Sequence, residues 1–136
     1  MTIYIHIPFC ISKCNYCDYY SIIANKEAIK KYINSLQTEL IKVASKYRNK
    51  EITSIFIGGG TPTSIDADHI VEILNKIKSN FNLSQNCEIS IEANPASNIN
   101  FSKLKETGIN RISFGVQSLN DEELRFLGRI HNANLA

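Results

Sequence analysis

Three cysteines near the start of the chain carry the clearest chemical signal in the sequence. Cys10, Cys14 and Cys17 share one short loop with the spacing C-x3-C-x2-C. Thiolates this close together can surround a compact [4Fe–4S] cubane, for which thiolates are the usual protein ligands. Three ligands for four irons would leave one iron open to a further molecule. Two alternatives exist for the same residues, namely a truncated zinc knuckle and free thiols.

The composition restricts the classes of function. The 136 residues, 43% of them hydrophobic, suffice for one globular unit and are too few for two domains. The formal net charge is only +2, and no basic block indicates binding to nucleic acid. Neither a membrane span nor a signal peptide is apparent. We therefore expect a cytoplasmic protein, in which disulfides are rare and clustered cysteines favour metal binding.

The elements that position these cysteines follow from the hydrophobic pattern. It predicts strands over residues 2–8, 52–57, 87–92 and 109–114. It predicts helices over residues 26–46, 66–79 and 102–106, and a fourth with Asn120 as N-cap and Glu123 completing a capping box. Four alternating strand–helix units predict an α/β fold with a parallel sheet and right-handed crossovers.

Each expected strand has an isoleucine-rich face and a mixed face. In the first strand, Ile3, Ile5 and Ile7 alternate with Tyr4 and His6. Strands buried on both sides of a parallel sheet usually read as continuous apolar runs instead. The pattern therefore predicts a barrel-like sheet whose mixed faces enclose a cofactor.

Chemically distinctive residues also follow the carboxyl end of every expected strand. The cysteine loop follows the first strand, residues 58–60 (Gly-Gly-Gly) follow the second, Glu92 ends the third, and Gln117 follows the fourth. In (β/α) barrels the active site is built at this edge, so these residues are expected to form one site. The alternatives are a flexible turn for the glycines and an ion pair with Arg111 for Glu92.

With these motifs the chain resembles the radical SAM superfamily. The resemblance extends through nearly the whole chain and rests on residues 4–17, 58–62, 88–95, 115–118 and 127–131. It implies that S-adenosylmethionine (SAM) chelates the open iron through its amino and carboxylate groups. It also implies that an electron from the cluster cleaves the sulfonium to a 5′-deoxyadenosyl radical.

The resemblance also implies a set of site residues. Its cluster ligands would be Cys10, Cys14 and Cys17, and its SAM contacts would be Tyr4, Tyr16, Gly59, Gly60, Thr61, Glu92, Gln117 and Arg129. For the two tyrosines, ordinary aromatic packing is an alternative. His6 and His131 are expected to be hydrogen-bonded histidines near the site rather than haem ligands, and Cys87 a small buried hydrophobe.

Within the superfamily, the chain resembles the branch of oxygen-independent coproporphyrinogen III oxidases and HemW-type haem chaperones. The oxidases carry another cysteine where this chain has Tyr19, and an extension before the first strand, which here begins at residue 2. We therefore expect a HemW-like protein. Its partners would be haem or porphyrin, a haem-accepting protein and a flavodoxin- or ferredoxin-type electron donor, with membrane contact only through acceptors. The alternative is the oxidase, which converts propionates to vinyls.

A third hypothesis concerns the length of the chain. A full (β/α) barrel needs roughly 200 residues or more. We therefore expect about four βα units of a larger barrel, with residues 1–136 as the N-terminal part of a radical SAM core domain. Such a fragment could bind a cluster alone, and its fourth strand would have an unpaired edge.

Overall fold

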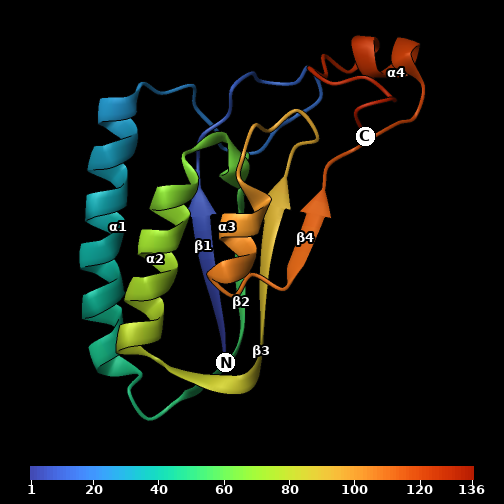
Figure 1. Cartoon of the computed structure of the whole chain (residues 1–136). Coiled ribbons are helices and arrows are strands. Elements are labelled where there is room, and N and C mark those ends of the chain that lie inside the picture. The colour runs from blue at the N-terminus through green and yellow to red at the C-terminus, as the bar shows by residue number, and fades with distance from the viewer.

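Four parallel strands form the frame of the molecule, and the computed structural model describes all of residues 1–136 (Figure 1). The strands are β1 (Thr2–Ile7), β2 (Glu51–Gly59), β3 (Asn82–Ala93) and β4 (Arg111–Phe114), in the order β1-β2-β3-β4. The helices are α1 (Lys26–Lys46), the short 3-10 helix η1 (Pro62–Ser64), α2 (Ala67–Asn80), α3 (Phe101–Glu106) and α4 (Asp121–Phe126). The expected α/β fold with a parallel sheet is confirmed. No helix is both long and apolar enough to cross a membrane.

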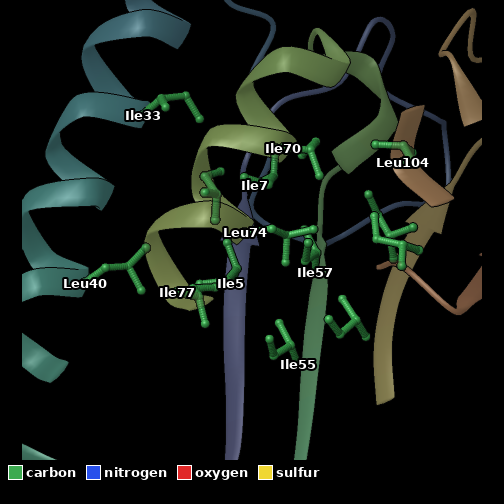
Figure 2. Close-up of a cluster of buried hydrophobic side chains, with 14 of the residues drawn as sticks. Ile5, Ile7, Ile33, Leu40, Ile55, Ile57, Ile70, Leu74, Ile77 and Leu104 are labelled. Carbon is green, nitrogen blue, oxygen red and sulfur yellow. The ribbon is translucent and has the colours of Figure 1, made fainter. Parts of the chain in front are cut away.

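The core forms where the isoleucine faces of the strands meet the helices. Ile7, Ile57 and Ile91 are fully buried on this face. Figure 2 shows side chains from α1, α2 and α3 converging on the same layer, among them Leu74 and Leu104. Each such side chain contributes about 1.5–3 kcal/mol by leaving water. The alternation read from the sequence therefore selects which face of the sheet the helices cover.

The opposite face of the sheet carries the mixed residues in register. Tyr4 lies beside Phe56, which lies beside Ser90, and in the next layer Glu92 lies beside Ser113. The rings of Tyr4 and Phe56 stack with their centroids 5.9 Å apart. This face has no covering helix, as expected for the inner wall of a partial barrel.

Two strand boundaries differ from the prediction for identifiable reasons. β3 begins at Asn82 rather than at residue 87, because its polar first residues pair with the start of β2 across a register shift and leave no apolar pattern. β4 begins at Arg111 rather than at residue 109. The Asn110 side chain accepts from the N–H of Ile89 at 2.9 Å and donates to the carbonyl of Cys87 at 3.0 Å, replacing ladder bonds.

The helices begin at polar caps. Every α-helix starts after an Asn or Asp whose side chain accepts a backbone N–H: Asn25, Asp66, Asn100 and Asn120. The predicted capping box at Glu123 is half formed: Asn120 accepts from the N–H of Glu123 at 3.4 Å, but the Glu123 carboxylate does not accept from the N–H of Asn120 directly. The Ser118 hydroxyl accepts from the N–H of Asn120 at 3.0 Å and donates to the Glu123 carboxylate, so this carboxylate reaches the cap only through Ser118.

The fourth strand lies at an edge of the sheet. β4 pairs only with β3, and all four of its residues are exposed. Phe114 is 48% exposed and packs only partly, against Phe101 of α3. The unpaired edge expected from the sequence is therefore present.

Candidate functional site

The loops that follow the four strands enclose a cavity of about 440 Å³. Figure 1 shows these loops gathered at the carboxyl ends of the strands. The sequence-predicted residues that line the cavity come from these loops, from the ends of β2 and β3, and from the segment after α4: Cys10, Cys14, Tyr16, Cys17, Gly59, Gly60, Thr61, Glu92, Gln117 and Arg129. The structure therefore brings together every predicted site residue except Tyr4.

The cysteine loop is closed at its base and tethered at its tip. At the base, Ile22 donates to the carbonyl of Pro8 at 2.7 Å, and Cys10 donates to the carbonyl of Ile22 at 3.0 Å. At the tip, Asn15 donates through its side chain to the carbonyl of Phe126 at 3.1 Å, at the end of α4. Backbone hydrogen bonds within residues 8–22 therefore fix the base of the cysteine loop, and the end of α4 fixes its tip.

All three cysteines of the loop line the cavity. Cys10, Cys14 and Cys17 are half-buried and unpaired by disulfides. No three His, Cys, Asp or Glu side chains lie close enough together to hold a single metal ion. Three thiols on one cavity match the donor type that a multi-iron group needs, in which each thiolate binds a different iron.

The glycine segment has a steric reason to lack side chains. A Cβ on Gly60 would lie 2.7 Å from the carbonyl oxygen of Phe9 and 3.0 Å from the sulfur of Cys10. Thr61 donates its N–H to the same Phe9 carbonyl at 2.7 Å, and its Oγ1 lies 3.5 Å from the Cys10 sulfur. The segment therefore lies directly against the cysteine loop and is not a free turn.

Glu92 extends its carboxylate across β2 into the cavity. Its Oε2 accepts from the backbone N–H of Gly59 at 3.2 Å. The alternative ion pair with Arg111 is wrong, because Arg111 pairs with Glu88 at 3.0 Å. Glu92 keeps a carboxylate available on the inner side of the site.

Arg129 joins two loops across the cavity. Its Nη1 donates to the sulfur of Cys14 at 3.1 Å and to the hydroxyl of Tyr16 at 3.5 Å, and its Nη2 donates to the carbonyl of Gly115 at 2.7 Å. Its Nε is buried without a partner in the protein. Burial raises the pKa of Tyr16, although the Arg129 guanidinium opposes this shift.

Tyr4 lies outside the cavity lining. It stacks on Phe56, and its hydroxyl lies 3.0 Å from Nδ1 of His6. Burial raises the pKa of Tyr4, and the negative charge of Glu92 raises it further. The alternative of aromatic packing therefore describes Tyr4, which sits one layer below Glu92 on the inner face.

Comparison with known proteins assigns the chain that carries these residues to a family. The family model of the radical SAM superfamily matches residues 4–135. The chain belongs to the radical SAM superfamily. It is 45% identical to the haem chaperone HemW of Buchnera aphidicola subsp. Schizaphis graminum over 97% of this chain and 36% of that protein. It is 39% identical to HemW of Bacillus subtilis over 94% of this chain and 35% of that protein.

A solved structure agrees with the fold of this radical SAM chain. The structure of coproporphyrinogen III oxidase (HemN) from Escherichia coli, described as a radical SAM enzyme, matches with a TM-score of 0.90 and 30% identity. The match covers 98% of this chain and 32% of that one. The chain thus spans about a third of the length of the relatives it matches.

Sequence reasoning missed several residues of this radical SAM site. Asn94, Ser113 and Tyr19 also line the cavity. Ser113 lies near the end of the fourth expected strand and Asn94 follows the third, so their places at the carboxyl ends of strands were the available signal. The tether from Asn15 to α4 had no such signal, because it joins residues 111 apart.

Proposed function

We propose that this chain holds a [4Fe–4S] cluster on Cys10, Cys14 and Cys17 and binds SAM beside it. One observation supports the proposal above all: three thiols and the family's SAM-contact positions line a single cavity at the carboxyl ends of parallel strands. The chemistry supplied by such a cluster is the one-electron cleavage of SAM.

Two side chains of opposite charge, Glu92 and Arg129, would bind different groups of SAM. Glu92 presents a carboxylate that can accept from an ammonium group, while the Arg129 cation lies on the opposite loop. Arg129 also keeps a buried Nε–H without a partner, which can donate to an acceptor of the ligand. The backbone of Gly59 and Gly60 lets the ligand approach closely. Tyr16 and Gln117 complete the wall, and Tyr4 lies one layer below, outside the lining.

The whole protein's role is proposed to be that of a HemW-like haem chaperone. Its relatives bear that name over nearly the full length of this chain. In this proposal a haem or porphyrin is bound and passed to an acceptor protein, and a flavodoxin- or ferredoxin-type donor reduces the cluster. Membrane contact would arise only through acceptors.

A second candidate is coproporphyrinogen III oxidation. It is favoured by the close structural match to HemN. The position two residues after Cys17 is Tyr19, where the oxidases carry a cysteine, and this favours the chaperone.

Anaerobic reconstitution with iron and sulfide tests the cofactor proposal. We expect a brown protein with about four irons per chain, bleached by dithionite, whose electron paramagnetic resonance spectrum changes when SAM is added. Colourless protein with one tightly bound zinc would contradict the cluster. A four-iron protein whose spectrum ignores SAM would contradict the second half of the proposal.

A paired assay separates the two candidate roles. The reduced protein is incubated with SAM and either haem or coproporphyrinogen III. The chaperone predicts stoichiometric haem binding, seen as a shifted Soret band, without turnover. Release of carbon dioxide with vinyl products would instead establish the oxidase.

A further inference from the structure

The loop between β4 and α4 contains a strained turn. Gln117 has φ of +70°, and it is the single non-glycine residue of the chain with a positive φ. The N–H of Ser118 donates to the carbonyl of Val116 at 3.0 Å, two residues back, so Gln117 is the centre of a three-residue turn. Such turns with positive φ are rare, and strained residues persist only where surrounding contacts hold them.

Two side chains from the segment after α4 donate hydrogen bonds to the backbone at and just before this turn. Arg129 donates from Nη2 to the carbonyl of Gly115 at 2.7 Å, and His131 donates from Nε2 to the carbonyl of Val116 at 3.0 Å. The Val116 carbonyl therefore accepts from both Ser118 and His131. Because a carbonyl only accepts, the proton of the imidazole is on Nε2.

His131 lies outside the cavity lining and contacts the backbone next to Gln117, which belongs to the lining. It is only 6% exposed and does not line the cavity, whereas Gln117 and Arg129 do. Its Nδ1 is buried and has no partner, so the bond to Val116 is the one polar contact that orients the ring. A buried imidazole with a single directed bond is well suited to fix a backbone carbonyl.

We propose that His131 is a positioning residue: its bond to Val116 stabilises the strained turn that presents Gln117 to the SAM cavity. The inference takes SAM as the ligand from the proposed function. Its account of the turn rests on geometry alone. Removing the donor should let Gln117 relax toward an ordinary negative φ. The Gln117 amide would then no longer face the cavity.

Three substitutions separate the hydrogen bond from the bulk of the ring. His131→Leu removes the donor and keeps an apolar side chain in the buried site. His131→Gln keeps an N–H donor at the same number of bonds from the backbone as Nε2. His131→Asn keeps a polar amide that is one bond shorter. His69→Leu, on α2 away from the cavity, is the matched control.

The first readout is amide hydrogen exchange of Ser118, which needs neither cluster nor SAM. The second is the dissociation constant of SAM for the reconstituted protein, measured anaerobically by calorimetry, with iron content as a check on the cysteine loop. We expect His131→Leu to accelerate Ser118 exchange and to weaken SAM binding about tenfold, near the value of one hydrogen bond, with iron unchanged. His131→Gln should stay within about twofold of the parent, and the His69→Leu control should match it.

Each other outcome has a definite meaning. Unchanged Ser118 exchange and SAM affinity in His131→Leu would overturn the inference. Loss of haem binding with unaltered SAM affinity would also overturn it, by making His131 a haem ligand. Should His131→Leu fail to fold, His131→Asn is expected to show the same two defects, and parent-like behaviour of His131→Asn would count against the inference. If the parent itself binds no SAM while exchange responds as expected, the proposed function fails and the positioning contact stands.

Discussion

The guanidinium of Arg129 donates a hydrogen bond to the sulfur of Cys14 at 3.1 Å, across 115 positions of sequence. A cation therefore lies beside one of the three candidate cluster ligands before any cofactor enters. Since Arg129 also donates to the carbonyl of Gly115, the cysteine loop and the loop after β4 are joined by a single side chain. The side chain that places a positive charge beside Cys14 therefore also fixes the backbone of the loop after β4.

Replacing Arg129 with Gln should lower the midpoint potential of the reconstituted cluster. A positive charge and a hydrogen bond at a ligand sulfur favour the more negative, reduced cluster. A charge-assisted hydrogen bond of about 1.4 kcal/mol corresponds to a shift on the order of 60 mV for one electron. Potentiometry monitored by electron paramagnetic resonance measures the shift.

The control for this change is Arg125→Gln, an exposed substitution on α4 outside the cavity lining. It should leave the potential unaltered. Equal potentials in the parent and in Arg129→Gln would show that the bond to Cys14 does not persist once the cluster is bound.

Replacing Cys14 with Ala should abolish the four-iron cluster. Cys14 lines the cavity, Cys10 and Cys17 are the other two proposed ligands, and the remaining cysteine, Cys87, lies in the core. Iron and sulfide content after anaerobic reconstitution, together with visible absorption, gives the measurement. Cys87→Ala is the matched control, because Cys87 is buried in the core and should leave iron content near four per chain. Equal iron loss in both variants would contradict the assignment of ligands.

Most of the frame could be predicted because its signals are local and periodic. Ile3, Ile5 and Ile7 of β1 recur every second residue, as do Ile55 and Ile57 of β2. This period identifies both the strand and its buried face. Parallel strands then place all the following loops at one edge, so the site followed from the fold. Glu92 and Gly60 line the same cavity for this reason.

What could not be predicted depends on contacts between distant residues or on the reach of one side chain. The Asn110 side chain replaces backbone bonds of β4, and Ser118 comes between Asn120 and Glu123. Neither arrangement changes the hydrophobic period. Tyr4 lies outside the cavity lining because its ring stacks on Phe56, its register partner in β2, and the period of a single strand does not identify that partner.

Replacing Tyr32 with Phe should destabilise the protein at neutral pH and have less effect in strong alkali. The Tyr32 hydroxyl donates to the carbonyl of His6. Burial, and then the charge of Glu39, raises the pKa of Tyr32 above its ordinary value of 10.0. An acid with a raised folded pKa contributes stability below the unfolded pKa, and this contribution is lost as pH rises through the folded value.

We therefore expect Tyr32→Phe to cost about 1 kcal/mol of unfolding free energy at pH 7, and the difference from the parent to shrink above pH 10. Urea unfolding across this pH range measures it. Tyr20→Phe, at a residue 72% exposed, should show no difference at either pH. A constant gap between the parent and Tyr32→Phe through pH 11 would refute the role of the proton.

Replacing Gly58 with Ala should destabilise the sheet at the floor of the site. A Cβ there would lie 2.7 Å from Cε1 of Phe56 and 3.0 Å from Oε2 of Glu92, so both side chains must move. Overpacking of this kind costs about 1–3 kcal/mol, offset in part by the stiffer unfolded chain. We expect a net loss of about 1 kcal/mol in urea unfolding.

The double variant Gly58→Ala with Phe56→Leu tests the cause of this loss. Removing the ring takes away the nearest atom, so the penalty of the added methyl should be smaller in the Phe56→Leu background than in the parent. The two substitutions should therefore couple favourably by about 0.5 kcal/mol or more. Strict additivity would show that the methyl acts through Glu92 or the backbone. A gain in stability for Gly58→Ala alone would mean that the cavity floor adapts without cost.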